Sequence, residues 1–125
     1  MRIEHIGLNV GNPAAMARWY CEHLGMKIIR QLHAKNFFIA DSTGNGIVEI
    51  YHNTTADIPD YHKIEPLVFH IAFVSKDVHA DVARLTAAGA AIAGEVKTTP
   101  DGDDMAFVKD PWGVTVQLVK RKKGI

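Results

Sequence analysis

Two histidines in strand-like segments are the first residues of this chain whose type and setting suggest chemistry. His70 lies within Val68–Val74 and His5 within Ile3–Val10, where apolar residues alternate with others. Successive strand side chains point to opposite faces, so each imidazole lies on the face opposite a regular apolar set. A buried polar side chain needs a hydrogen-bonding partner or an ion. The pattern therefore predicts two inward-facing histidines at equivalent places.

Two more polar residues interrupt strand-like segments further along the chain. Glu49 lies within Ile47–Tyr51 and Gln117 within Val114–Val119, each opposite an aliphatic set. Two imidazoles, one carboxylate and one amide oxygen suit a borderline divalent metal such as Zn²⁺, Ni²⁺, Co²⁺, Fe²⁺ or Mn²⁺. The predicted metal ligands are His5, Glu49, His70 and Gln117.

An internal repeat places these residues at matching positions. The offset is 65 residues from His5 to His70 and 68 from Glu49 to Gln117. Each repeat is predicted to contain a strand, a helix and three strands. Because such a unit is too small to bury a sheet face alone, we predict an α+β fold. Two paired βαβββ modules, about residues 1–53 and 67–122, would form a single domain with the helices outside, joined by the connector His52–Pro66.

Capping residues mark the two helices. Asn12 before Pro13 predicts a helix to about Leu24, and Asp77 predicts a second helix that ends at Gly89. The first helix is expected to bury Ala17, Tyr20, Cys21 and Leu24, and the second Val78, Val82 and Leu85. The predicted strands are Ile3–Val10, Met26–Leu32, Phe37–Ala40, Ile47–Tyr51, Val68–Val74, a weak strand near Ala91–Lys97, Met105–Val108 and Val114–Val119.

Composition narrows the possible partners. The 125 residues are 47% hydrophobic, and the 14 basic residues equal the 14 acidic ones, which gives no electrostatic case for nucleic acid or an anionic membrane. No leader or membrane span is apparent, so a cytoplasmic protein is expected. The single cysteine, Cys21, suits a reducing compartment and is expected to be a buried, inert thiol. The basic run Lys120–Lys123 is expected to be a frayed, solvated tail.

Several segments together resemble the vicinal oxygen chelate superfamily of glyoxalases, bleomycin-resistance proteins and dioxygenases, and most of all bacterial glyoxalase I. The similar segments are Ile3–Ile6, Leu24–Lys27, Val48–Ile50, Phe69–Ala72, Ala106–Gly113 and the strand of Gln117. The resemblance covers nearly the whole chain. It implies a cupped mixed sheet that holds a metal at its floor, in a protein that often forms its sites across a homodimer.

The resemblance also implies roles for individual residues. The four predicted ligands occupy the family's metal-ligand positions, and Asn53 matches an asparagine that helps to hold glutathione. The expected substrate-binding residues are Asn9, Tyr51 and Asn53. This chain departs from glyoxalase I at three places: Gln117 replaces a glutamate that acts as ligand and proton carrier, while Asn9 and Pro66 replace arginines. The loss of both arginines weakens the case for binding a glutathione carboxylate.

The implied function is that of a metal-dependent lyase or isomerase acting on a small carbonyl compound or its thiol adduct through a metal-bound enolate. Glu49, the only carboxylate among the four ligands, is then the expected proton carrier, since the neutral amide of Gln117 cannot act as a base. Ring-cleaving relatives usually have glutamate at position 117, so Gln117 argues against that activity. The alternative is a metal-free, bleomycin-resistance-like protein that binds a small molecule between two subunits.

Overall fold

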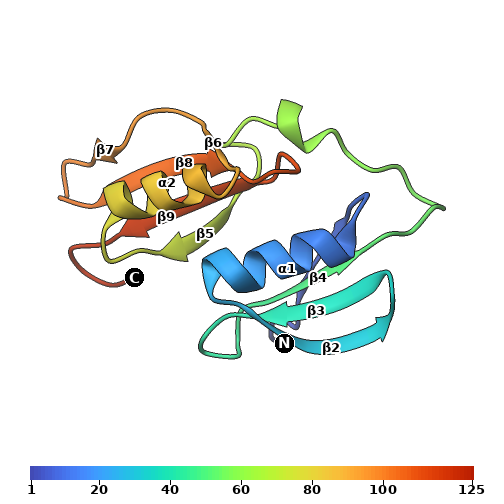
Figure 1. The fold of residues 1–125 in the computed structure, drawn as a ribbon. Coiled ribbons are helices and arrows are strands. Elements are labelled where there is room, and N and C mark those ends of the chain that lie inside the picture. Colours follow the sequence, from blue (N-terminus) through green and yellow to red (C-terminus); the bar gives the residue numbers. More distant parts are fainter. The chain divides into compact units, whose positions relative to one another are not determined.

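The computed structural model describes residues 1–125 as two compact units, Met1–Pro59 and Asp60–Ile125 (Figure 1). The units contain two α-helices and nine strands, with one helix and one mixed sheet in each. This confirms the α+β fold of two βαβββ-type modules. The boundary at Pro59 lies inside the predicted connector. The union of the two modules into a single domain stays a prediction.

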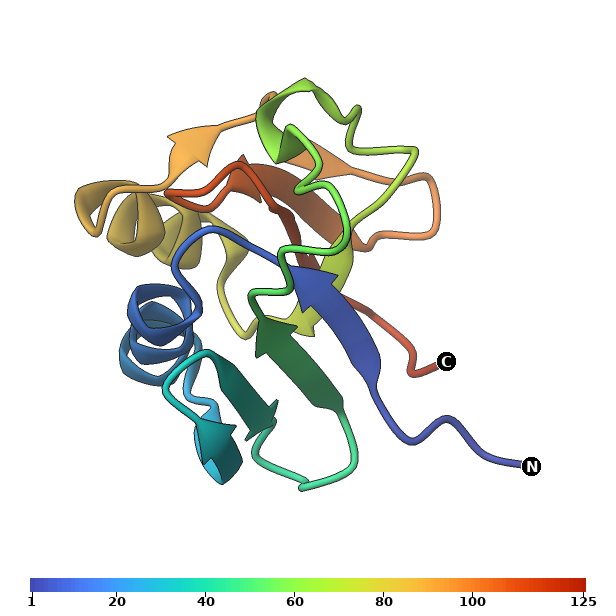
Figure 2. The same ribbon diagram turned by 90° about the vertical axis from the view of Figure 1, so that its right-hand side faces the viewer.

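The first module has the predicted order of elements. These are β1 (Ile6–Asn9), α1 (Pro13–Leu24), β2 (Lys27–His33), β3 (Asn36–Ala40) and β4 (Ile47–Tyr51). The strand order in the sheet is β1-β4-β3-β2, and β1 pairs with β4 in parallel, as the blue and green arrows of Figure 2 show. The parallel pairing sets Gly7 beside Glu49, so polar positions of β1 and β4 share one face of the sheet.

The second module repeats this topology. Its elements are η1 (Tyr61–Lys63), a short 3₁₀ helix, then β5 (Ile71–Val74), α2 (Val78–Ala87), β6 (Ala91–Ile92), β7 (Lys97–Thr98), β8 (Asp104–Lys109) and β9 (Thr115–Lys120). The order β5-β9-β8-β6 matches that of the first sheet, and β7 also pairs with β8. The predicted single strand near Ala91–Lys97 is instead two short strands, because the chain turns at Gly94, where φ is +116°.

The strands that lead each module are shorter than predicted. They begin at Ile6 and Ile71 rather than at Ile3 and Val68. Residues before Ile71 form a turn, in which the Val68 amide donates to the Glu65 carbonyl oxygen at 2.9 Å. His5 and His70 therefore each lie one residue before a strand, where side chains are less constrained by the ladder.

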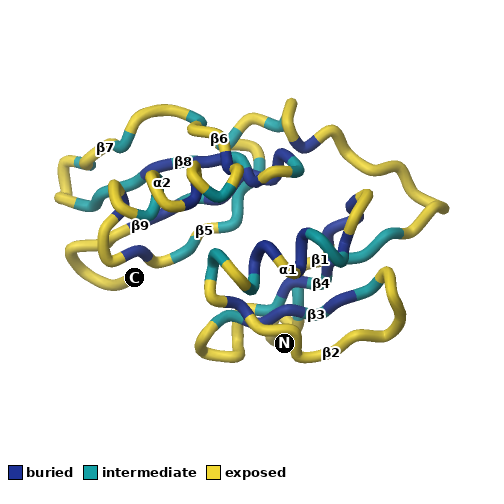
Figure 3. The backbone as a smooth tube through the Cα atoms, in the orientation of Figure 1, coloured by how far each residue is buried: buried dark blue, intermediate teal, exposed yellow.

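Both helices begin where the caps predict, but the buried stripe of α1 differs from the prediction. The Asn12 Oδ1 accepts from the Ala15 amide at 3.1 Å, and the Asp77 Oδ1 accepts from the Ala80 amide at 3.0 Å. Helix α1 lies against β3 and β4, and its buried residues are Pro13, Met16, Ala17, Trp19 and Tyr20 (Figure 3). In α2, Val78 and Leu85 are buried as predicted, whereas Val82 is only half-buried.

Cys21 is half-buried rather than part of the core, and so is Leu24. Ala17 and Tyr20 are buried as predicted, but the prediction was wrong for Cys21 and Leu24, because α1 also turns Met16 and Trp19 inwards. Partial burial still raises the pKa of the Cys21 thiol, and a hydrogen bond with the Ile28 backbone opposes this effect. A raised pKa disfavours the reactive thiolate, and the inertness of the thiol stays a prediction.

The basic tail is attached for part of its length. Strand β9 includes Lys120, the Arg121 guanidinium donates to Asp103 Oδ2 at 2.9 Å, and the Lys122 amide donates to Asp103 Oδ1 at 2.8 Å. The Lys122 amide and, to a lesser degree, Arg121 lower the pKa of the Asp103 carboxyl. The prediction of a frayed tail is therefore wrong for residues 120–122. Neither helix has the length and apolar content needed to cross a membrane.

Candidate metal centre

A first cluster on the sheet of the first module consists of the polar residues His5 and Glu49 and the ring of Phe38. The His5 Nε2 lies 3.2 Å from Glu49 Oε2, and the imidazole meets the edge of the Phe38 ring, with centroids 5.4 Å apart. Phe38 and Glu49 are cross-strand partners in β3 and β4. Both polar side chains are largely covered, with 31% and 18% of the His5 and Glu49 side chains exposed.

Each ring nitrogen of His5 faces a carboxylate oxygen. Its Nδ1 contacts the Glu4 carboxylate, which can only accept, so Nδ1 carries the proton. In the neutral imidazole, Nε2 then presents a lone pair towards Glu49 Oε2. Two ligands of one divalent ion lie about 3.0–3.5 Å apart, because the bonds to the metal are about 2.0–2.2 Å long. The observed pair fits a shared cation, and Glu4 takes the place of the outer carboxylate that commonly supports a ligating histidine.

Asn36 fixes the position of the Glu49 carboxylate, and Gly7 leaves room for it. The Asn36 Nδ2 donates to Glu49 Oε1 at 2.8 Å, whereas the Asn36 Oδ1 is buried without a hydrogen-bond partner. On β1, a Cβ added at Gly7 would lie 3.2 Å from Tyr51 Cε1 and 3.7 Å from Glu49 Oε2. Glycine at position 7 therefore gives these side chains room, and Asn36 leaves Oε2 as the oxygen that faces His5.

His70, Phe107 and Gln117 form an equivalent second cluster in the second module. The His70 and Phe107 rings meet edge to face at 5.3 Å, and Phe107 is the cross-strand partner of Gln117. The Gln117 Nε2 points to the Met105 Sδ at 3.8 Å, a weak contact that leaves the amide oxygen as the natural ligand atom. The His70 Nδ1 donates to the Pro66 carbonyl oxygen at 2.8 Å, so its Nε2 also presents a lone pair.

The structure thus brings His5 against Glu49, and it sets His70 against Phe107, the cross-strand partner of Gln117. No three histidine, cysteine, aspartate or glutamate residues lie close enough together to hold a metal without further ligands. The chemistry of each cluster fits a divalent ion, and a common site for the two pairs stays a prediction.

The three predicted substrate-binding residues lie in the first module near Glu49. Asn9 is buried, with its Oδ1 accepting from the Asn53 amide at 2.8 Å and its Nδ2 donating to the Asn53 and Ala56 carbonyls at 3.0 and 3.2 Å. The Asn53 Oδ1 accepts from the Thr55 amide and hydroxyl. These bonds attach the start of the connector to β1, and substrate contacts by Asn9, Tyr51 and Asn53 stay predictions.

Four residues that surround the ligands were not predicted from the sequence. They are Glu4, Asn36, Met105 and Phe107. A repeat signal was present, because Asn36 and Phe38 each precede their equivalents, Met105 and Phe107, by 69 positions. The sequence offset does not show that these positions lie opposite β4 and β9, the strands that carry Glu49 and Gln117. The observed strand pairing does.

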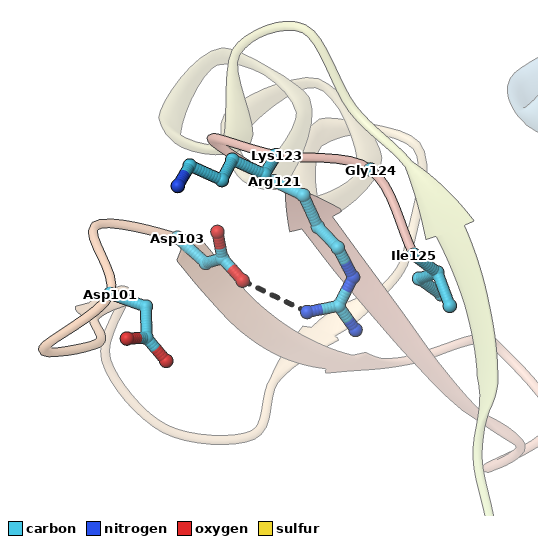
Figure 4. A pocket seen from close by; sticks show the side chains of 6 residues that line it. All are labelled: Asp101, Asp103, Arg121, Lys123, Gly124 and Ile125. Carbon is cyan, nitrogen blue, oxygen red and sulfur yellow. Dashed lines mark hydrogen bonds and ion pairs between the residues drawn. The ribbon is translucent and has the colours of Figure 1, made fainter.

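Two hollows in the surface are lined by none of the residues of the two clusters. One of about 510 Å³ is lined by Asp101, Asp103, Arg121, Lys123, Gly124 and Ile125, with the Asp103–Arg121 ion pair across it (Figure 4). Another of about 240 Å³ lies beside the start of α1, near Lys35 and His52. Neither contains a predicted metal ligand.

Comparisons with known proteins extend over both modules. A family model described as Glyoxalase/Bleomycin resistance protein/Dioxygenase superfamily matches residues 2–118. A probable lactoylglutathione lyase from Vibrio parahaemolyticus is 28% identical over 130 residues, which cover 98% of this chain and 92% of that protein. A lactoylglutathione lyase from Neisseria meningitidis is 28% identical over 132 residues, which cover 99% of this chain and 94% of that one.

A solved structure shows the same fold. A glyoxalase family protein from Bacillus cereus superimposes with a TM-score of 0.78 at 16% identity, covering 96% of this chain and 93% of that chain. At this identity the likeness concerns the fold alone, and it includes both βαβββ modules.

Proposed function

Because the chain belongs to the Glyoxalase/Bleomycin resistance protein/Dioxygenase superfamily, we propose that it is a metal-dependent lyase or isomerase of glyoxalase I type. Its substrate is a small carbonyl compound or the adduct of that compound with a thiol. The observation that carries this proposal is the 3.2 Å approach of His5 Nε2 to Glu49 Oε2, with the other nitrogen of His5 held by Glu4. The similarity to lactoylglutathione lyases supports the reaction type.

The proposed ligands are His5, Glu49, His70 and Gln117, with the imidazoles using Nε2 and the amide using its oxygen. When bound there, a divalent ion supplies Lewis acidity towards a substrate carbonyl, which makes the neighbouring C–H bond more acidic. The native metal is one of Zn²⁺, Ni²⁺, Co²⁺, Fe²⁺ and Mn²⁺.

Glu49 is the proposed base that moves the proton between neighbouring substrate carbons. It is the only carboxylate among the four residues, and its Oε1 is held by the Asn36 amide while Oε2 faces the site. The Asn36 hydrogen bond gives the carboxylate a fixed orientation, which a proton transfer requires. Gln117 is neutral and takes no proton.

Phe38 and Phe107 are the proposed apolar wall of the site. Each ring lies edge to face with a histidine, at centroid distances of 5.4 and 5.3 Å. The rings limit the movement of the imidazoles and keep water away from the reacting carbon, which strengthens every charge interaction there.

Exchange of substrate hydrogen with deuterated water tests the proposal. The protein loaded with one of the five metals is given a 2-oxoaldehyde and glutathione, and separately the 2-oxoaldehyde with another small thiol. We expect product that carries solvent deuterium, and a loss of at least about 100-fold in rate for Glu49→Gln. Glu95→Gln, at an exposed position, is the matched control and keeps full activity. Full activity in Glu49→Gln would remove Glu49 as the base, and a protein that binds small molecules without any metal would support the sequestering alternative.

We also propose that the protein works in the cytoplasm as a homodimer. The resemblance implies the dimer, and the exposed edge strand β2 carries Ile28, Ile29 and Leu32 with 47%, 55% and 51% exposed, as an interface between subunits would. Light scattering during size-exclusion chromatography tests this: a mass of one chain would contradict it.

A further inference from the structure

We infer that Lys109 is a positioning residue for His70, which it reaches through the end of the connector. The ammonium group holds the segment Tyr61–Ile64 against β8 within the second module, and Glu65 joins this segment to Pro66, whose carbonyl orients the imidazole. The inference rests on the proposed function only for what His70 binds. The positioning itself belongs to the metal-free protein.

The Lys109 ammonium joins β8 to the connector. Its Nζ donates to the Tyr61 carbonyl oxygen at 2.9 Å and to the Ile64 carbonyl oxygen at 2.5 Å. Tyr61 is the first residue of η1 and Ile64 follows its last, and the Tyr61 carbonyl oxygen also accepts from the Ile64 amide at 3.2 Å. Burial lowers the pKa of the Lys109 ammonium, while Asp110 and Glu65 act in the opposite direction. One side chain therefore fixes two points of a segment whose backbone bonds, from Lys63 to Asp60 and from Ile64 to Tyr61, are local.

A close backbone contact supports the same placement of the segment. Gly113 has φ +93°, and a Cβ added there would lie 2.5 Å from the His62 amide nitrogen. The turn that contains Gly113 thus touches the connector backbone directly. Tyr61, next to His62, is only 8% exposed. Two features of the second module, the Lys109 side chain and the Gly113 turn, therefore both contact the segment Tyr61–Ile64.

The segment continues into the turn that precedes His70. The Val68 amide donates to the Glu65 carbonyl oxygen at 2.9 Å, and the His70 Nδ1 donates to the Pro66 carbonyl oxygen at 2.8 Å. A carbonyl oxygen can only accept, so this bond fixes the Nδ1–H form of the ring and presents the Nε2 lone pair. Only Glu65 separates Ile64, which Lys109 holds, from Pro66, which supplies the acceptor of His70. Movement of the segment Tyr61–Ile64 would therefore move this acceptor.

The two modules therefore orient their histidines by different means. The Nδ1 of His5 is held by the carboxylate of the adjacent Glu4, whereas the Nδ1 of His70 is held by a backbone carbonyl whose position depends on Lys109. Outer groups that orient a ligating histidine change metal affinity by about 10- to 100-fold. Because Lys109 acts one step further out, the expected change is near the lower end of this range.

The test compares Lys109→Met with Lys109→Arg and with Lys120→Met, an exposed lysine on the neighbouring strand β9. Two-bond ¹H–¹⁵N spectra of the imidazoles report the form of each ring in the metal-free protein. We expect the His70 ring in the Nδ1–H form in the wild type, Lys109→Arg and Lys120→Met, and a mixture of both forms in Lys109→Met. The His5 ring is unchanged in all four proteins.

Zn²⁺ titration by calorimetry provides the second measurement. Lys109→Met is expected to bind Zn²⁺ about tenfold more weakly, with Lys109→Arg and Lys120→Met near the wild type. An unchanged His70 ring in Lys109→Met overturns the inference. A changed ring in a protein that binds no metal in any variant supports the positioning and contradicts the proposed function. If Lys109→Met does not fold, Lys109→Gln, which keeps one donor, is measured by the same criteria.

Discussion

Replacing Asn36 by leucine should separate the stability of the first module from its affinity for metal. Asn36 donates to Glu49 Oε1 at 2.8 Å, and its own Oδ1 is buried without a partner. Leucine has a similar shape, removes the donor and also removes the unpaired acceptor. The substitution therefore deletes one favourable and one unfavourable contribution at the same site.

The two contributions to stability have similar size and opposite sign. A hydrogen bond to a charged group contributes about 1.5–3 kcal/mol, and an unpaired buried acceptor costs about 1–3 kcal/mol. The free energy of unfolding of the metal-free protein should then change by no more than about 2 kcal/mol. Metal affinity has no such compensation, because Glu49 loses the group that orients it. A fall of about 10- to 100-fold is expected, equivalent to about 1.4–2.7 kcal/mol of binding free energy.

Urea unfolding of the metal-free protein and competition with a chromophoric chelator for Zn²⁺ measure the two quantities. Asn45→Leu, in the exposed turn between β3 and β4, is the matched control and should change neither by much. The reasoning is refuted if Asn36→Leu binds Zn²⁺ as tightly as the wild type. It is also refuted if the variant loses stability by about 3 kcal/mol or more, because the unpaired Oδ1 would then carry no cost.

Three further predictions concern residues outside the ligand set. Asp110 is buried and its Oδ1 accepts from two backbone amides, each at 2.9 Å, so Asp110→Ala should lower the free energy of unfolding by about 2–4 kcal/mol and Asp110→Asn by less, as measured in urea. The Thr43 hydroxyl lowers the pKa of the Asp41 carboxyl. The wild type should therefore have a higher free energy of unfolding than Asp41→Asn at pH 7, and this difference should vanish as the pH falls through the lowered pKa. An equal difference at pH 7 and pH 2 would contradict this. Burial raises the pKa of Cys21, so a chromogenic disulfide reagent at pH 8 should label the native thiol more slowly than the unfolded one.

The sequence predicted the topology because the repeat restricts the possible arrangements. Strand alternation and the caps at Asn12 and Asp77 are local signals, the offset between His5 and His70 is a repeat signal, and all of them appear in the structure. The same alternation placed Glu49 and Gln117 on the faces of the histidines. Family membership was predictable for the same reason, since the matching segments are short and ordered along the chain.

Cross-strand register was the part that local patterns could not supply. Asn36 and Phe38 have no special spacing from Glu49 in the sequence, and only antiparallel pairing of β3 and β4 brings them together. The Glu4 contact depends on where β1 begins, and that boundary was predicted three residues too early. Similarly, the stripe through Cys21 failed because periodicity gives the width of a buried face but leaves its direction to tertiary packing.

Zn²⁺ titration of three proteins tests the central claim most directly: the wild type, His5→Ala from the first module and His70→Ala from the second. One ion per chain is expected for the wild type, with affinity lost by at least about 100-fold in either variant, because each histidine would supply one of four ligands to the same ion. Binding that survives in His70→Ala but not in His5→Ala would confine the ion to one module and contradict the shared site, as would a wild type that binds no divalent metal at all.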